Sequence, residues 1–329
     1  MKINTFSALT ILMILLITSI TFISCKKNEK KENESIVSDN VEEKTPFFKL
    51  SLAQWSLHRA IRDNKTHDPL DFAEKANELG FQGIEYVSQL YNNHIEAMGI
   101  DSVLAILKTN SEKHGMKNVL IMVDGEGSLA STDDKERKKT VENHFKWVDA
   151  AKYLGCHSIR VNAHGEGTPE EVAVAAVDGL NQLSTYAEKQ GINILVENHG
   201  GYTSNGQWLA DVMKKVGKSN VGTLPDFGNF CQTIGYGSIN DVNCKDPYDI
   251  YKGLTELMPY AKAVSAKSYD FDEGGSQPKI DYLKMMEIVK NAGYTGFVGV
   301  EYEGSNVSEL KGIELTKELL LKVGKELAQ

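Results

Sequence analysis

The chain has 329 residues, of which 41% are hydrophobic and 25% are charged, and its formal net charge is −9. This composition excludes a disordered chain, and the length is sufficient for one large domain. The negative charge argues against nucleic acid or an anionic membrane surface as the main partner, because an acidic protein is attracted to neither. We therefore expect a small ligand that is neutral or bound with the help of a cation.

The first 24 residues have the pattern of an export signal. A basic start at Lys2 precedes a predominantly apolar run over residues 6–23, and a small residue then precedes Cys25. This pattern resembles a bacterial lipoprotein signal. The resemblance implies cleavage before Cys25, lipidation of Cys25, and a periplasmic or outer-membrane lipoprotein that contacts the membrane only through its lipid. An uncleaved anchor helix is the alternative, which is disfavoured because hydrophilic sequence begins at Lys26.

Residues 25–46 form a predicted tether. They are rich in Lys, Glu, Asn and Ser and contain few residues that a core could bury, so we expect this segment to be disordered. The folded domain is then predicted to span residues 47–329.

Three cysteines remain in that domain, so at most one pair can form within it. Cys231 and Cys244 lie in one predicted loop and could form a disulfide. Cys156 directly precedes a predicted strand, where we expect a buried and unreactive thiol.

One pattern recurs along the domain: a helical segment ends at a glycine, a few residues follow, and then an apolar strand begins. Glycine at a helix end favours the left-handed cap that releases the chain toward the next element. The six glycines are Gly80, Gly115, Gly155, Gly191, Gly217 and Gly293. The expected strands are 49–56, 83–87, 119–123, 159–162, 194–197, 221–226, 263–267 and 297–301.

Helix starts are also marked in the sequence. Asp68 followed by Pro69 predicts an N-cap with proline at the first helical position, and residues 168–171 predict a capping box. About eight strand–helix units in roughly 280 residues predict an α/β fold, a (β/α)₈ TIM barrel. A doubly wound open sheet is the alternative, but it normally carries a glycine-rich turn after its first strand, and residues 54–58 contain no glycine.

Polar side chains gather at the carboxyl ends of the predicted strands, which in a barrel meet at one mouth. They are Trp55, His58, Glu85, Asp124, Arg160, Asn162, His164, Glu197, His199, Asp226, Asn229, Lys267, Glu301 and Glu303. Aromatic residues that could stack on a sugar ring are Trp55, Tyr86, Tyr202 and Trp208, although packing is the commoner role of such residues.

Three carboxylates carry the strongest chemical signal. Glu197, Asp226 and Glu301 each follow an apolar or aromatic-flanked strand and are expected to point into the same cavity. Converging carboxylates repel one another unless a cation or a shared proton neutralises them, so a divalent metal is the economical explanation. Oxygen ligands favour Mg²⁺, Mn²⁺ or Ca²⁺ over zinc.

Three segments, 194–199, 224–229 and 298–302, resemble those of the xylose-isomerase-like barrel superfamily, which includes sugar isomerases and epimerases, inositol-pathway enzymes and apurinic endonucleases. The resemblance extends from about residue 48 to the end of the chain. It implies four metal ligands, of which Glu197, Asp226 and Glu301 match the first, second and fourth. Ser265 stands where the third, a histidine, is expected.

Because a neutral hydroxyl is a weak ligand, three arrangements stay open. The three carboxylates hold a metal together with water, His199 or His164 supplies a nitrogen, or the site works without a metal. Where a metal binds, the resemblance favours Mn²⁺ or Mg²⁺.

The resemblance also implies a reaction. Glu197 and Glu301 are the expected catalytic pair that removes and returns a proton alpha to the carbonyl of a keto sugar. Lys267 is expected either to stabilise the enediolate oxygen or to form a salt bridge inside the barrel. The expected substrate-binding residues are Trp55, His58, Glu85, Arg160, His164, His199 and Asn229.

These expectations describe an exported sugar isomerase or epimerase with a small carbohydrate as its ligand. One alternative is a 3-keto-glycoside lyase, which removes the proton at C2 and expels the glycosidic leaving group. Another is a sugar-binding lipoprotein without catalysis, which the serine at position 265 favours and the retained glutamates oppose. A nuclease is disfavoured by the charge, the export signal and the few histidines. The sequence indicates no particular oligomeric state.

Overall fold

The computed structural model of the protein describes residues 45–233 and 235–328. The predicted signal peptide (1–24), the lipidation site Cys25 and nearly all of the predicted tether lie outside these described residues. Within them, none of the helices combines the length and the apolar character that crossing a membrane requires.

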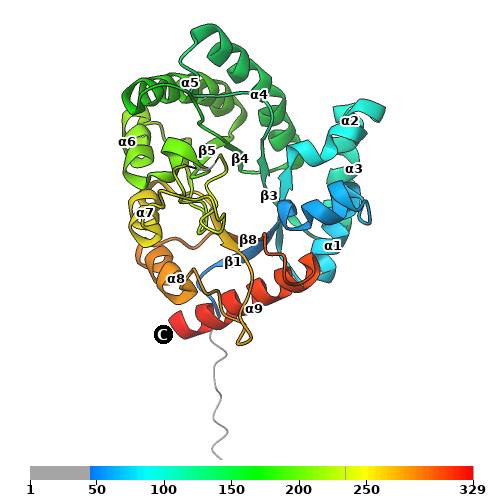
Figure 1. The fold of residues 1–329 in the computed structure, drawn as a ribbon. Helices are drawn as coiled ribbons and strands as arrows, with labels where there is room; N and C mark the ends of the chain where they lie inside the picture. The colour runs from blue at the N-terminus through cyan, green and yellow to red at the C-terminus, as the bar shows by residue number, and fades with distance from the viewer. Residues whose placement is uncertain (1–44, 234, 329) are drawn as a thin grey trace, which may run out of the picture. The chain divides into compact units, whose positions relative to one another are not determined.

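Eight parallel strands form a barrel surrounded by helices, as the sequence predicted (Figure 1). Hydrogen-bonded neighbours follow the order β6-β5-β4-β3-β2-β1-β8-β7. Between β6 and β7 the barrel is joined by isolated parallel bridges, Thr223 to Ala261 and Asp226 to Ser265. The strands are β1 (Lys49–Ala53), β2 (Gly83–Val87), β3 (Lys117–Met122), β4 (Ser158–Val161), β5 (Asn193–Glu197), β6 (Val221–Leu224), β7 (Val264–Ser268) and β8 (Phe297–Tyr302).

The helices alternate with these strands and cover the outside of the barrel (Figure 1). They are α1 (Phe72–Glu78), α2 (Asn92–Met98), α3 (Ile100–Lys113), α4 (Asp134–Leu154), α5 (Pro169–Gln190), α6 (Gly206–Val216), α7 (Ile250–Leu257), α8 (Tyr282–Asn291) and α9 (Glu309–Leu327). Because helices pack on the outside and side chains fill the inside, the strands are buried on both faces. Ile194, Leu195 and Val196 of β5 are all fully buried.

The local signals explain where elements begin and end. All six predicted cap glycines have positive φ, between 60° and 76°. Gly155 and Gly191 end α4 and α5 in the left-handed conformation and donate their N–H groups to carbonyls of the last turn. The predicted cap at Asp68 and the capping box between Thr168 and Glu171 are both present.

Two strand ends were predicted too late. β1 ends at Ala53 rather than at residue 56, because residues 54–57 turn into a short 3₁₀ helix. The Gln54 side chain stabilises this turn by accepting a hydrogen bond from Val87 N and donating to Tyr91 Oη. β6 ends at Leu224, since Pro225 lacks the N–H that would continue the ladder.

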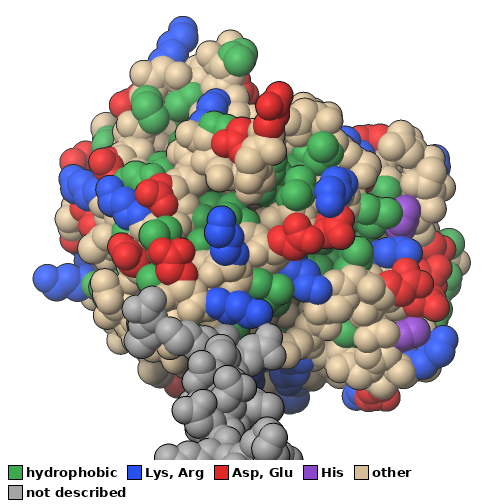
Figure 2. Space-filling model, turned by 90° about the horizontal axis from the view of Figure 1, so that it is seen from below, with side chains coloured by type: hydrophobic (Ala, Val, Ile, Leu, Met, Phe, Trp, Pro, Cys, Tyr) green, Lys and Arg blue, Asp and Glu red, His purple; other side chains and the backbone are tan. Residues whose placement is uncertain are grey.

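Charge is mixed on the face shown in Figure 2, where Lys and Arg side chains alternate with Asp and Glu side chains over the described residues. Interspersed charge of this kind gives no basic field to attract a phosphate backbone.

Candidate active site

Three buried carboxylates meet at the mouth of the barrel. Glu197 ends β5, Asp226 follows β6, and Glu301 lies near the end of β8. The three residues are at most 4% exposed, and each offers an oxygen that lies within 4.8 Å of the others. Among the described residues, this group includes neither His164 nor His199.

Ser265 lies between two of these carboxylates. Its hydroxyl oxygen is 2.6 Å from Asp226 Oδ2 and 2.9 Å from Glu301 Oε2. The hydroxyl has one proton, so it can donate to only one of the two carboxylates at a time. The other contact needs a proton or a cation on the carboxylate.

Burial supplies the reason why protons or a cation are held here. It raises the pKa of Asp226 to about 7, although Lys267 opposes the shift. Burial also raises the pKa of Glu197 to about 8, against the effect of Arg160. The cluster therefore has a high affinity for positive charge near neutral pH.

Backbone and amide contacts fix the position of Asp226. Gly228 N donates to Asp226 Oδ1 at 2.8 Å, and the backbone N–H of Asp226 donates to Asn198 Oδ1 at 2.7 Å. Asn198 in turn donates to the carbonyls of Asp226 and Asn229. Asn198 was not among the predicted site residues; it is fully buried and joins the segment after β5 to the segment after β6.

Two buried cations face the carboxylates. Arg160 of β4 lies 2.8 Å through Nε from Glu197 Oε2 and 2.8 Å through Nη1 from Asp124 Oδ1. The first contact is an ion pair without the direction of a hydrogen bond, so within the described part of the chain Glu197 Oε2 has no hydrogen-bond partner. The Arg160 guanidinium also lowers the pKa of Asp124 to about 2, although burial acts in the opposite direction.

Lys267 of β7 is the second cation. Its Nζ lies 3.7 Å from Glu301 Oε2 and 3.4 Å from Glu303 Oε2, and it donates to Asn229 Oδ1 at 3.3 Å. Asn229 also donates through Nδ2 to Glu197 Oε1 at 3.1 Å. Asn229 thus connects the lysine to the glutamate on the opposite side of the cluster.

A chain of hydrogen bonds orients His199. Asn162 Nδ2 donates to Asp124 Oδ1 at 2.7 Å, which turns the amide oxygen toward His199 Nδ1 at 2.8 Å. The proton of the imidazole is then on Nδ1, and Nε2 is left as an acceptor. Burial keeps the pKa of His199 well below its usual value, with Arg160 and Lys267 acting in the same direction. The His164 ring lies 6.1 Å from that of His199.

Trp55 and His58 lie after β1, on the other side of the mouth. Their rings stack with centroids 4.5 Å apart. His58 Nδ1 is also 3.6 Å from Glu309 Oε1, a carboxylate that accepts hydrogen bonds from the backbone N–H groups of Arg59 and Ala60. These contacts join His58 to Trp55 and to α9.

Glu85 of β2 lies inside the barrel and is 1% exposed. Its Oε1 accepts a hydrogen bond from Ser51 at 2.6 Å, whereas Oε2 has no partner among the described residues. A side chain at Gly299 would place its Cβ 2.7 Å from this carboxylate. Burial raises the pKa of Glu85 to about 7, and Glu301 adds to the shift.

We expect the Glu85 proton to make folding depend on pH. The pKa is about 7 in the folded protein against 4.5 in a model peptide, so the stabilising contribution is complete below about pH 4.5 and is lost as the pH rises through 7. A shift of this size corresponds to about 3 kcal/mol. Glu85→Gln should remove this loss, so the variant should exceed the native protein in stability above pH 7.

Urea unfolding from pH 4.5 to pH 8 checks this prediction. The difference between native and Glu85→Gln protein isolates Glu85 from the other carboxylates, because both chains share Glu197 and Asp226. Parallel stability curves over this range would contradict it.

The residues present fit a divalent cation. Three carboxylates converge, two of them have raised pKa values, and buried Glu197 Oε2 finds no hydrogen-bond partner in the described part of the chain. Ser265 adds a neutral oxygen between Asp226 and Glu301. The acidic group could thus hold a metal through oxygen ligands alone, the kind of donor set that Mg²⁺ and Mn²⁺ prefer.

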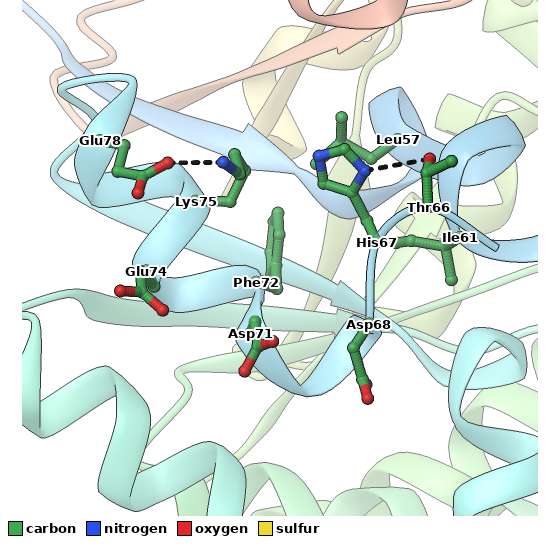
Figure 3. Close-up of a pocket in the computed structure, with 10 residues that line it drawn as sticks. All are labelled: Leu57, Ile61, Thr66, His67, Asp68, Asp71, Phe72, Glu74, Lys75 and Glu78. Carbon is green, nitrogen blue, oxygen red and sulfur yellow. Dashed lines mark hydrogen bonds and ion pairs between the residues drawn. The ribbon is translucent and has the colours of Figure 1, made fainter.

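A separate hollow lies beside the barrel, between the loop after β1 and α1 (Figure 3). Its volume is about 240 Å³. Lys75 and Glu78 form an ion pair at one end, and Thr66 and His67 are hydrogen-bonded at the other. None of its lining residues belongs to the carboxylate cluster, so it is not part of this site.

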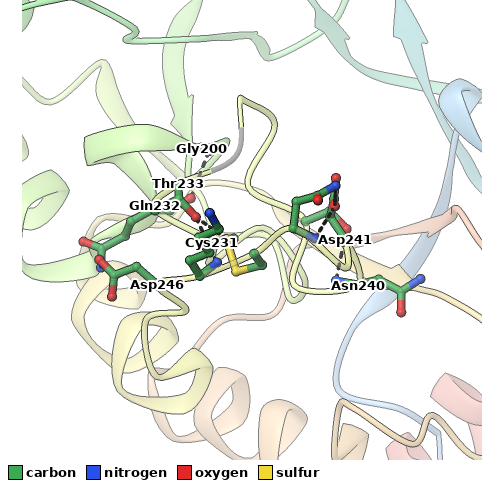
Figure 4. Close-up of a disulfide and its surroundings, with 12 residues drawn as sticks. Gly200, Cys231, Gln232, Thr233, Asn240, Asp241 and Asp246 are labelled. Atoms are coloured by element: carbon green, nitrogen blue, oxygen red, sulfur yellow. Dashed lines mark hydrogen bonds between the residues drawn. A yellow bond between two sulfur atoms is a disulfide. The ribbon is translucent and has the colours of Figure 1, made fainter.

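The structure assigns the cysteines and one of the aromatic residues, Tyr86. Cys231 and Cys244 form a disulfide in the loop after β6 (Figure 4), and Cys156 is free and buried as predicted. Tyr86 is 1% exposed and packs inside the protein, where its hydroxyl donates to Asn118. Tyr86 is therefore not available to stack on a sugar.

Sequence reasoning missed Tyr236, an exposed aromatic residue of that disulfide-bonded loop. Its ring centroid lies 5.3 Å from that of His199. An aromatic residue between two cysteines, shortly after the predicted ligand Asp226, was the available signal.

The fold and the acidic mouth together define a (β/α)₈ barrel with a carboxylate cluster at its carboxyl end. A family model described as xylose isomerase-like TIM barrel matches residues 73–323, which is more than half of the chain. The chain belongs to this family, as its sequence motifs had indicated.

Solved structures of the same fold are similar over most of their length. A structure of the IOLI protein with a bound zinc atom has a TM-score of 0.63 and 17% identity, covering 85% of this chain and 99% of the other. A xylose isomerase-like barrel protein from Mycobacterium smegmatis in complex with magnesium has a TM-score of 0.61 and 17% identity, with coverage of 86% and 98%. The 3-keto-D-glucoside 4-epimerase YcjR from E. coli has a TM-score of 0.62 and 14% identity, with coverage of 83% and 98%.

A curated relative shares a shorter segment. The C-glycoside deglycosidase alpha subunit of Arthrobacter globiformis is 34% identical over 65 residues, which is 19% of this chain and 18% of the relative. The match therefore spans less than a fifth of that relative's length. The solved structures include sugar epimerases, and at 12% to 17% identity their likeness shows the fold of this chain.

Proposed function

We propose that this protein is a keto-sugar isomerase or epimerase that moves a proton alpha to a carbonyl. The observation that carries the proposal is the convergence of Glu197, Asp226 and Glu301 in a buried cluster with two cations beside it. Family membership and the sugar epimerases among the structural neighbours support the same class of reaction.

Glu197 and Glu301 are assigned as the proton-transfer pair. They stand at the ends of β5 and β8, and Ser265 and Asp226 lie between them. The pKa of Glu197, raised to about 8 by burial, suits a group that takes and returns a proton near neutral pH. One glutamate removes the proton, and the other returns it to the neighbouring carbon or to the opposite face.

Glu197, Asp226 and Glu301 are also assigned as the ligands of a divalent metal, with Ser265 as a neutral fourth oxygen. When bound, Mg²⁺ or Mn²⁺ would act as a Lewis acid that polarises the carbonyl and makes the neighbouring proton more acidic. Lys267 is placed to neutralise negative charge on the enediolate oxygen, because its ammonium group stays charged beside Glu301 and Glu303. Arg160 positions Glu197 through their ion pair, and His199 Nε2 is assigned to accept a hydrogen bond from a substrate hydroxyl.

Elimination from a 3-keto glycoside is the second candidate. One glutamate of the pair would remove the C2 proton, which is acidic beside a C3 ketone. The electron pair would then form the C1–C2 double bond as the glycosidic C1–O bond breaks. The leaving alcohol takes up a proton. The names of the deglycosidase relative and of the 3-keto-glucoside epimerase favour this substrate class, and so does the proposed export, since sugar phosphates are cytoplasmic intermediates.

The test uses the native protein in deuterated water. Ketohexoses and methyl 3-keto-glycosides are incubated with protein that has been stripped with EDTA and then supplied with Mg²⁺, Mn²⁺ or no metal. Deuterium incorporation by mass spectrometry, with a changed sugar, supports the isomerase or epimerase, and incorporation with release of methanol supports elimination. Sugar binding without incorporation under any metal condition would overturn the enzyme and leave the sugar-binding lipoprotein. We expect stripping to reduce incorporation and metal to restore it.

A further inference from the structure

The loop between β6 and α7 is fixed against the carboxylate site. Cys231, which is bonded to Cys244, donates its N–H to Gly237 O at 2.7 Å, and Ile239 N donates to Gly228 O at 2.9 Å. Ser238 adds a hydrogen bond to the Tyr269 hydroxyl, which itself donates to Gly228 O. Residues 236–239 therefore lie along the segment that carries Asp226.

Gly237 makes this close approach possible. It has a φ of 73°, and a Cβ there would lie 2.6 Å from Gly200 N and 2.7 Å from Ser204 Oγ. Only glycine fits both the conformation and the space. The loop is thus in contact with the segment after β5, beside Gly200 in Figure 4, and Gly200 directly follows His199.

Tyr236 is the side chain that this arrangement presents at the mouth. Tyr236 is 71% exposed, and its ring is tilted by 50° against the His199 ring, with centroids 5.3 Å apart. Single exposed hydrophobic residues are ordinary on protein surfaces. The position of Tyr236 is more informative than its exposure, because its aromatic face lies beside the imidazole that offers Nε2 to a ligand.

Arg62 approaches the same place from the other side. It follows β1, which lies four strands from β5 in either direction around the barrel. Its guanidinium is 5.5 Å from the Trp55 ring centroid. Asp63, which accepts its hydrogen bond, raises the pKa of Arg62 most, and the nearby Tyr236 hydroxyl acts in the same direction. Arg62 over Trp55 and Tyr236 beside His199 therefore both belong to loops that follow carboxyl ends of barrel strands.

We propose that Tyr236 and Arg62 form a sugar-ring subsite at this entrance, where Tyr236 stacks on the C–H face of a pyranose and Arg62 donates to its hydroxyl groups. Aromatic faces bury the apolar face of a flat ligand, and the guanidinium offers several donors in one plane. The inference rests on the proposed function and sharpens it, because the ligand becomes a cyclic glycoside rather than an open-chain sugar.

Binding of methyl glycosides tests the subsite without any reaction, because they carry no ketone. Affinities of methyl glucoside, galactoside and mannoside are measured by calorimetry for native protein, Tyr236→Ala, Tyr236→Phe and Arg62→Met. For the glycoside that binds the native protein best, Tyr236→Ala should weaken binding roughly tenfold, as loss of an aromatic contact does. Tyr236→Phe should stay within about twofold, since it keeps the face of the ring. Arg62→Met should also weaken binding.

Val242→Ala is the matched control. Val242 lies in the same disulfide-bonded loop and is 96% exposed, so its truncation should leave binding unchanged, and thermal unfolding verifies that all variants are folded. The subsite is overturned if native protein binds none of the three glycosides, or if Tyr236→Ala binds as tightly as the native protein. Weakened binding with no deuterium incorporation into keto sugars would keep the subsite and refute the proposed function. Deuterium incorporation by the native protein, together with unchanged glycoside binding in Tyr236→Ala, would support the proposed function and refute the subsite.

Discussion

We expect Glu197→Gln and Glu301→Gln each to slow deuterium exchange, from the stereoisomer whose proton that glutamate removes, by about 10²- to 10⁴-fold, which is the usual contribution of a general base. The amide cannot take up the proton, but it preserves the shape of the side chain. Glu197 also keeps its contact with Asn229, because the retained oxygen still accepts that hydrogen bond. The loss should therefore appear in kcat more than in sugar affinity.

The two variants should differ in a further respect. If each glutamate serves one face of the substrate, each variant stops epimerisation, while exchange starting from one stereoisomer survives in only one of them. Glu126→Gln is the matched control, since Glu126 is a partly buried carboxylate after β3 that bonds to Trp147 and lies outside the cluster. Bound metal is measured in every variant, because Glu197 and Glu301 are also the proposed ligands. Full exchange in both variants at native metal content would rule out the assigned pair.

The carboxylate cluster could be predicted because its signal is local and repeated. Each strand of a parallel barrel is an apolar run, and a polar residue directly after the run lies at the mouth whichever strand carries it. Glu197, Asp226 and Glu301 all obey this pattern, and the closed barrel brings them together. Knowledge of strand ends alone was sufficient, even where the predicted end was two or three residues late.

Contacts across the barrel could not be predicted in the same way. Glu85 faces Gly299, which is distant in sequence and comes close only because β1 lies between β2 and β8. Ser265 was read as a lost ligand, whereas its hydroxyl connects Asp226 and Glu301. Tyr236 escaped notice because a loop has no periodicity, and its place depends on a disulfide and on one glycine that fits against Gly200.

Loss of Arg160 should strongly reduce the stability of the barrel. It is 4% exposed and pairs with Asp124 and with Glu197, whose side chains are 17% and 3% exposed. Removing one member of a buried ion pair leaves its partner's charge uncompensated and costs about 3–5 kcal/mol. We therefore expect Arg160→Met to lower the free energy of unfolding by about this amount at pH 7, as measured by urea denaturation.

Arg137→Met is the matched control. Arg137 is similarly buried and also pairs with two carboxylates, but Asp178 and Asp134 are 46% and 89% exposed, so water can solvate them once the arginine is gone. Its loss should cost only about 1 kcal/mol. A double variant, Arg160→Met with Asp124→Asn, separates charge from packing: it should recover part of the stability, because it removes the charge of Asp124, whereas Glu197, with a pKa of about 8, is mostly protonated at pH 7. Equal losses in the two arginine variants would show that the buried charges at the mouth are compensated by something other than Arg160.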